Sequence, residues 1–282
     1  MSRFKRNICF LLLFALVSLA GCQESSGSAK VSIAKSSVVI YGDSRSGHDH
    51  HRDIVNAILK VDPEIVFHSG DLVNDGNAAD LWKECNEIIA PIIETAKFYP
   101  ASGNHEKESK LYYDNFELPN NEKWYSVTHD SILFIVLNTN LDFGAGSEQY
   151  EWLTETLKNV DDKIKYKIAL SHHPVYSTGS HWKDGKALQD SLVPLFEEYS
   201  VNAVFTGHDH DYERSLVKGI YYIVTGGGGA PLRSQKTTSE FSQKFIEEYH
   251  FCALDIIDGQ LNVTVYNKDL HVIDELTISN KQ

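Results

Sequence analysis

The sequence has few cysteines, few prolines and no excess of positive charge. Four Cys in 282 residues do not make a disulfide scaffold, and we expect the distant Cys85 and Cys252 to be buried and unpaired. Lys and Arg number 26 against 39 Asp and Glu, and the formal net charge of −13 lacks the basic character of a nucleic-acid binder. With 18 Gly, 7 Pro and 42% hydrophobic residues, the chain is neither collagen-like nor low-complexity. We therefore expect a globular protein without a nucleic-acid partner.

The start of the chain also lacks an apolar run long enough to span a membrane. Residues 8–19 are almost entirely apolar and follow a basic start, but a spanning helix needs roughly 20 such residues. This combination is typical of a signal peptide. The run ends in Leu19-Ala20-Gly21-Cys22, which resembles the lipobox of bacterial lipoproteins, where the cysteine becomes lipidated and the preceding segment is cut away.

We therefore predict a lipoprotein signal peptide over residues 1–21, a Ser/Gly-rich tether over residues 22–36 and one domain over residues 37–282. Lipidation of Cys22 would hold this domain at the bacterial cell envelope, outside the cytoplasm, with the lipid as its membrane anchor. The alternative is an ordinary cleaved signal with a cysteine there by chance.

Strand-like and helix-like segments alternate along the body of the chain. Short apolar runs that stop at glycine, such as Val38–Tyr41 and Ile65–His68, predict buried strands. Helices are predicted over residues 53–59, 78–96, 148–159 and 188–199. We expect Pro91 to break the second of these, and the Asp258-Gly259 pair to form a hairpin turn. The order favours one α/β domain with a C-terminal part rich in strands.

Short polar clusters follow the early strands. They are Gly42-Asp43-Ser44-Arg45, Gly70-Asp71-Leu72-Val73-Asn74, Gly103-Asn104-His105-Glu106, Ser171-His172-His173-Pro174 and Gly207-His208-Asp209-His210. Because ligands bind beside the carboxyl ends of the strands in an open α/β sheet, we expect these side chains to form one site. Glycine beside the polar residue lets the backbone turn sharply and present it.

These clusters supply carboxylate, amide and imidazole ligands. Such ligands suit manganese, iron, zinc, cobalt or nickel, and the absence of cysteine disfavours a structural zinc site. A single ion does not need six groups, whereas two ions that share one carboxylate do. Two ions about 4 Å apart are a known arrangement for displacement at phosphorus. We therefore predict two divalent or trivalent metal ions as cofactors.

In this order, the five clusters resemble the motifs GDxH, GDxxxx, GNHE, a lone His and GHxH of the calcineurin-like metallophosphoesterase superfamily. The resemblance runs from about residue 38 to about residue 228, and the stretches 172–176 and 207–214 are similar to the purple-acid-phosphatase-like branch. It implies an α/β fold, a four-layer αββα sandwich in which two central mixed β-sheets are flanked by helices. It also implies hydrolysis of phosphate esters.

The resemblance assigns roles to individual residues. The implied metal ligands are Asp43 and His210 at the first ion, Asp71 between the two ions, and Asn104, His172 and His208 at the second. His105 is then a general acid or a donor to a phosphate oxygen, and a water between the metals is the nucleophile. Glu106 supports the site from behind and orients His105. His181 is a candidate contact for the substrate.

Two positions depart from the family pattern. Arg45 stands where the first motif normally has His, and Asn74 stands where the acid-phosphatase branch supplies Tyr, so no purple colour is expected. The first metal is then one ligand short. Arg45 binds the substrate phosphate while water fills the open position; or a histidine at 48, 50 or 51 supplies the missing nitrogen; or the resting protein holds one metal. We favour the first explanation.

We therefore predict a metal-dependent hydrolase that cleaves a small phosphorylated substrate, a phosphate monoester with diesters as a further option. The alternative is a catalytically weak or inactive family member that binds phosphate or a polyanion at the cell surface. Arg45 favours this alternative, whereas Asn104 and His105 disfavour it, because a pure binding protein has no need of a catalytic acid.

Overall fold

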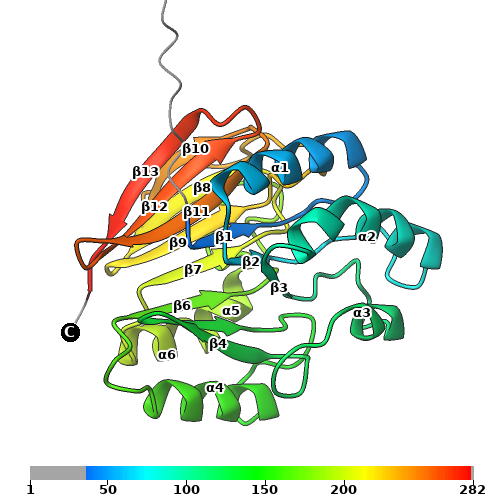
Figure 1. The fold of residues 1–282 in the computed structure, drawn as a ribbon. Coiled ribbons are helices and arrows are strands. Elements are labelled where there is room, and N and C mark those ends of the chain that lie inside the picture. Colours follow the sequence, from blue (N-terminus) through cyan, green and yellow to red (C-terminus); the bar gives the residue numbers. More distant parts are fainter. Residues whose placement is uncertain (1–35, 281–282) are drawn as a thin grey trace, which may run out of the picture. The chain divides into compact units, whose positions relative to one another are not determined.

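The computed structural model describes residues 36–280, in which two β-sheets pack face to face and helices cover the outer side of each sheet (Figure 1). The predicted signal peptide, Cys22 and nearly all of the predicted tether lie outside these residues. Within the described part of the chain, no helix is long and apolar enough to cross a membrane.

The first sheet has six strands in the order β13-β12-β11-β1-β2-β3. Their bounds are β1 Val38–Tyr41, β2 Ile65–His68, β3 Lys97–Pro100, β11 His250–Ile257, β12 Gln260–Asn267 and β13 Val272–Ile278. Strands β1, β2 and β3 are parallel, so their carboxyl ends share one edge. Helices α1 (His48–Val61) and α2 (Ala79–Ile93) cover the outer face, where Ile54 and Ile58 of α1 belong to the same buried cluster as Val39 and Phe251.

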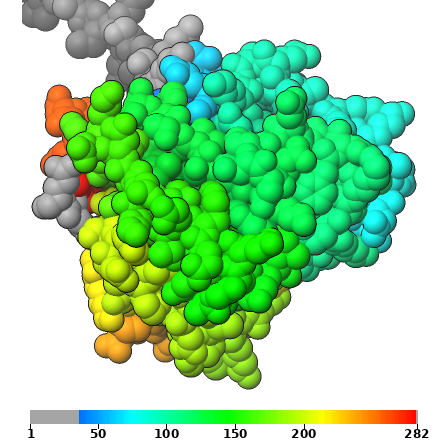
Figure 2. All heavy atoms as spheres, turned by 90° about the horizontal axis from the view of Figure 1, so that it is seen from below, coloured from blue at the N-terminus to red at the C-terminus, as the bar shows by residue number. Residues whose placement is uncertain are grey.

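The second sheet has seven strands in the order β10-β8-β9-β7-β6-β5-β4. Their bounds are β4 Tyr125–His129, β5 Ile132–Val136, β6 Tyr166–Leu170, β7 Ala203–Thr206, β8 Tyr212–Val217, β9 Ile220–Thr225 and β10 Ser242–Ile246. Helices α4 (Glu148–Lys158), α5 (Lys186–Ser191) and α6 (Val193–Glu198) pack on its outer face. Figure 2 views the body from the side of α4, where segments coloured green form much of the surface.

The inner faces of the two sheets form the main core. Phe67 of β2 meets Phe134 of β5 with ring centroids 4.5 Å apart, and both side chains are fully buried. Strands β1, β2, β5 and β7 are buried along their whole length, as expected for strands covered on both faces. The predicted α/β fold with two central mixed sheets flanked by helices is confirmed.

The local predictions are mostly confirmed, and two differ at proline. Helix α2 continues past Pro91 to Ile93, because a proline in the last turn removes a single hydrogen bond close to the end. The predicted helix over residues 188–199 is two short helices, α5 and α6, with Pro194 in the first turn of α6. Strands β8 and β10 were not predicted. The Asp258-Gly259 turn joins β11 to β12 with positive φ at both residues, as a two-residue hairpin requires.

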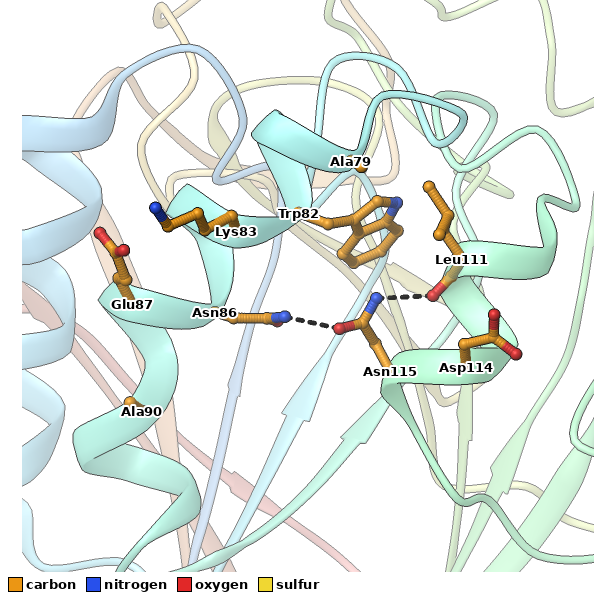
Figure 3. A pocket seen from close by; sticks show the side chains of 9 residues that line it. All are labelled: Ala79, Trp82, Lys83, Asn86, Glu87, Ala90, Leu111, Asp114 and Asn115. Atoms are coloured by element: carbon orange, nitrogen blue, oxygen red, sulfur yellow. Dashed lines mark hydrogen bonds between the residues drawn. The ribbon is translucent and has the colours of Figure 1, made fainter.

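Cys85 and Cys252 are buried and free, as predicted. A separate surface hollow of about 620 Å³ lies between α2 and α3 (Lys110–Asn115), beside Trp82, Asn86 and Asn115 (Figure 3). None of the predicted site residues lines this hollow.

Candidate metal centre

The loops after β1, β2 and β3 of one sheet meet the loops after β6 and β7 of the other. Three groups of side chains there lie close enough to hold a cation, each with ligand atoms within 4.8 Å of one another; one is His181, Asp184 and His208, and the other two share Asp71. Of the two that share Asp71, the first group is Asp43, Asp71 and His210, and the second is Asp71, His172 and His208. Asn104 Oδ1 lies 2.9 Å from His172 Nε2, so the amide joins the second group.

The backbone at three of these residues is left-handed. Asp43, Asp71 and His208 have φ values of 56°, 61° and 69°, a region that residues other than glycine rarely adopt. The neighbouring Gly207 lets the Asp43 carboxylate come close to the backbone, because a Cβ at this position would lie 2.2 Å from Asp43 Oδ2. Strained backbone of this kind gathers at functional sites, where the surrounding structure holds it in place.

Two of the histidines have their tautomers set by carbonyl groups. His172 Nδ1 donates to the Ser69 carbonyl at 2.9 Å, and His210 Nδ1 donates to the Pro231 carbonyl at 2.8 Å. Nε2 of each ring therefore carries the lone pair that faces the site. Burial lowers the pKa of His172, and it lowers that of His210 to about 4, so both rings are neutral ligands at neutral pH.

The two clusters fit a cation chemically. Asp43 Oδ1 and His210 Nε2 are buried without a hydrogen-bond partner among the described residues, although such atoms are normally satisfied. Burial, followed by the nearby Asp71 carboxylate, raises the pKa of Asp43 well above its usual value. A carboxylate, an imidazole and a second carboxylate in this setting are the ligand set of a divalent or trivalent transition metal.

Glu106 holds the loop that carries Asp71. Its carboxylate accepts hydrogen bonds from the backbone N–H groups of Asp71 and Leu72 at 2.9 Å and of Gly103 at 2.6 Å. Burial and then the charge of Asp71 raise the pKa of Glu106 to about 8. The hydrogen bonds described for Glu106 go to backbone N–H groups, and none of them reaches the His105 side chain.

His105 is oriented by Asn74 instead. His105 Nδ1 donates to the Asn74 carbonyl at 2.7 Å, and Nε2 lies 3.8 Å from Asp71 Oδ2. The side chain is 26% exposed, so a substrate can reach it. Nε2 is therefore the ring atom available for proton exchange at the cluster.

The two positions that depart from the family pattern contact each other. Arg45 Nε donates to Asp71 Oδ2 at 3.0 Å, and Arg45 NH1 donates to Asn74 Oδ1 at 3.1 Å. Burial alone would raise the pKa of Asp71, but His172, His105 and Arg45 hold it below the usual value. The guanidinium thus stands at the edge of the first cluster, beside the shared carboxylate.

The nearby histidines of α1 do not complete the first cluster. His48 pairs with Glu84 at 3.4 Å, His50 stacks on Tyr249 with centroids 4.0 Å apart, and His51 contacts the Tyr41 hydroxyl at 3.2 Å. None of them belongs to a described ligand cluster. The explanation that one of them supplies the missing nitrogen is therefore not supported.

Sequence reasoning missed two residues near His181. Asp209 is fully buried, and its Oδ1 lies 2.9 Å from His181 Nδ1 and accepts the His181 backbone N–H at 3.0 Å. Arg233 NH1 lies 3.0 Å from His181 Nδ1 and 3.3 Å from Nε2, and it donates to the His208 carbonyl at 3.2 Å. Asp209 sits inside a predicted cluster and could have been considered, whereas no pattern marks Arg233.

The sequence profile of the calcineurin-like phosphoesterases matches residues 36–212, and the chain belongs to that family. This membership implies a dinuclear metal site, for which the two clusters that share Asp71 provide ligands.

Several proteins of similar sequence are named purple acid phosphatases. The chain is 26% identical to "Probable inactive purple acid phosphatase 27" of Arabidopsis thaliana, over 86% of this chain and 49% of that protein. It is 27% identical to a "Nucleotide pyrophosphatase/phosphodiesterase" of Hordeum vulgare, over 76% of this chain and 72% of that protein. The chain thus spans about half the length of the first of these relatives.

Among solved structures, the purple acid phosphatase PPD1 from seeds of yellow lupin (Lupinus luteus) is similar with a TM-score of 0.75. It is 25% identical in sequence, and the match covers 86% of this chain and 53% of that chain. This likeness confirms the two-sheet fold.

Proposed function

We propose that this protein hydrolyses phosphate monoesters, with diesters as a further option, at a dinuclear metal centre. The observation that carries the proposal is the position of Asp71 in both ligand clusters. One shared carboxylate lets two cations lie close together. Asp43, Asp71 and His210 would hold one ion, and Asp71, Asn104, His172 and His208 would hold the other.

The chain's own residues divide the work around the substrate. Bound cations at this centre supply Lewis-acid stabilisation and lower the pKa of water. His105 Nε2 faces the cluster and exchanges a proton with the substrate, while the Asn74 carbonyl keeps the ring in place. Arg45, 13% exposed, offers further N–H groups to phosphate oxygens.

A metal titration tests the proposal. The soluble chain from residue 23 onward is stripped with a chelator, and manganese, zinc, iron, cobalt or nickel is added while hydrolysis of an aryl phosphate is followed. We expect activity to return with about two ions per chain, as a dinuclear centre requires. Full activity in the metal-free protein would contradict the proposal.

A second candidate function is a surface protein that binds phosphate or a polyanion without turnover. The contact of Arg45 with Asp71 favours it, because a fixed guanidinium beside a ligand disfavours a cation there. The relative named a probable inactive phosphatase also supports it.

His105→Ala separates the two candidates. In an enzyme it should lower the turnover of an aryl phosphate by roughly 10²–10⁴ while metal content and phosphate binding stay unchanged. The matched control is His129→Ala, on β4 and outside both ligand clusters. A wild type that binds phosphate but turns over no ester when loaded with metal would support the binding protein.

We also propose that the protein is anchored at the bacterial cell envelope through lipid on Cys22. The lipobox-like residues 19–22 and the apolar run before them support this proposal. Expression in a bacterial host with labelled fatty acid should label the full chain and not Cys22→Ala. Equal labelling of both would contradict it.

A further inference from the structure

Arg233 reaches the metal centre from a segment that the family profile does not cover. The profile ends at residue 212, and Arg233 follows the glycine run at 226–229. Its backbone N–H donates to the His210 carbonyl at 3.0 Å, and its NH1 donates to the His208 carbonyl at 3.2 Å. The residue is therefore tied to both histidines of the last cluster.

His181 and Asp209 determine how the guanidinium of Arg233 is held. A carboxylate accepts and does not donate, so His181 Nδ1 must carry the proton that Asp209 Oδ1 receives at 2.9 Å. Nδ1 then cannot also accept from Arg233, although NH1 lies 3.0 Å from it. The other ring nitrogen, Nε2, lies 3.3 Å from Arg233 NH1. His181 is thus a positioning residue for Arg233, with Asp209 behind it.

Both arginines keep unused donors. A guanidinium has five N–H groups. Among residues 36–280, the hydrogen bonds of Arg45 involve Nε and NH1, and those of Arg233 side-chain atoms involve NH1. Arg45 NH2 and the Nε and NH2 groups of Arg233 have no partner there. The charges of both arginines also act on Asp43, where each lowers the pKa that burial raises.

We propose that Arg45 and Arg233 form a two-arginine clamp that selects phosphate monoesters over diesters. Arg45 approaches through Asp71, and Arg233 approaches through His208, so the cluster has a guanidinium on each of these two sides. A monoester offers three terminal oxygens and two negative charges. A diester has an ester group in place of one oxygen and would leave a guanidinium without its anion, which is costly in a partly buried site. This inference rests on the proposed function.

The test compares two substrates with the same leaving group, p-nitrophenyl phosphate and methyl p-nitrophenyl phosphate. We expect wild type to prefer the monoester. Arg233→Gln and Arg45→Gln should each lower kcat/KM for the monoester by about 10²–10³ and that for the diester by about tenfold or less. Arg233→Lys should restore part of the loss, because it keeps the charge but not the fork.

Binding of inorganic phosphate is the readout that does not depend on turnover. In isothermal titration calorimetry of the metal-loaded protein, Arg233→Gln should lower the affinity for phosphate by roughly 10–100-fold while the metal content stays unchanged. His181→Ala should weaken it less, and the double variant should bind as Arg233→Gln does, because His181 acts through Arg233. Lys236→Gln, an exposed residue of the same segment, removes one charge as the matched control.

The outcomes separate this inference from the proposed function. If the metal-loaded wild type cleaves neither ester, the proposed function fails, and phosphate binding still tests the clamp. If Arg233→Gln and Arg45→Gln bind phosphate as wild type does and keep its ratio of monoester to diester hydrolysis, the clamp is wrong while the hydrolase stands. A wild type that prefers the diester would also overturn the clamp.

Discussion

The two ligand clusters share Asp71 but differ in what surrounds them. Asp71 Oδ1 lies 3.4 Å from His172 Nε2 of the second cluster, whereas Oδ2 accepts a hydrogen bond from Arg45. The second cluster thus has two imidazoles, an amide and a carboxylate oxygen free of arginine. The first has three groups, and a guanidinium occupies the other oxygen of Asp71. The two clusters are therefore unequal as cation sites, because a single arginine adds a fixed positive charge to the first of them.

The largest effect is expected from Asp71→Asn, which removes the carboxylate that both clusters share. Both ions should be lost at micromolar metal, and activity should fall to background, because each cluster loses its common charge. Equilibrium dialysis with elemental analysis measures the metal content. Retention of one ion at wild-type affinity would show that the clusters are independent.

His172→Ala and His210→Ala each remove one imidazole, the first from the second cluster and the other from the first cluster. We expect the second cluster to bind its ion more tightly than the first. His172→Ala should weaken this tighter ion by at least about 10²-fold, since even loss of a residue that only orients a ligand costs 10–100-fold in metal affinity. His210→Ala should leave the tighter ion in place and weaken the other. Competition with a chromogenic chelator resolves the two affinities. The reverse order would assign the tighter site to the first cluster.

A smaller change is expected from Arg45→Gln, and it has opposite signs for metal and substrate. Removal of the positive charge beside Asp71 should strengthen the weaker ion about tenfold, while monoester turnover falls. Calorimetric titration of the second equivalent measures the gain. Lys107→Gln is the matched control, since Lys107 pairs with Asp75 at 2.8 Å and is half-exposed. A loss of metal affinity in Arg45→Gln would mean that the arginine organises the ligand.

The smallest effect concerns a buried histidine outside both clusters. Burial lowers the pKa of His250 to about 4, although its Nδ1 donates to the Glu248 carbonyl, which favours the charged ring. Tyr212 packs edge-on against the ring. The folded state therefore resists protonation that the unfolded chain accepts near pH 6.5. The stability held by the neutral ring is complete above about pH 6.5 and is lost as the pH falls toward 4.

His250→Gln should remove this acid sensitivity. Between pH 7.5 and 5.5, urea unfolding of the metal-free protein should show wild type losing about 1.4 kcal/mol more than the variant. Metal content at neutral pH should be the same in both, which separates this histidine from the ligands. An identical pH dependence of the two proteins would mean that the pKa of His250 is the same in the folded and the unfolded state.

The positions of the predicted ligand residues could be anticipated because their signals are local. Asp43, Asp71 and Asn104 each follow a short apolar strand and a glycine, so the strand pattern and the motif place them at one sheet edge. The strands β8 and β10 escaped prediction, and β10 has only partly buried or exposed residues, so it lacks a clear apolar pattern. The effect of proline on the helices was predicted wrongly, because a proline near a helix end removes few hydrogen bonds.

The chain alone determined the α/β class, the order of the ligand motifs and the two departures at Arg45 and Asn74. The folded structure was needed to see that these departures touch each other, that Glu106 binds backbone N–H groups, and that His181 and Asp209 hold Arg233. These contacts join loops that are far apart in the sequence and that follow different strands. Spacing along a chain reports which face or end a residue occupies, whereas the direction of a side chain depends on the packing of both sheets.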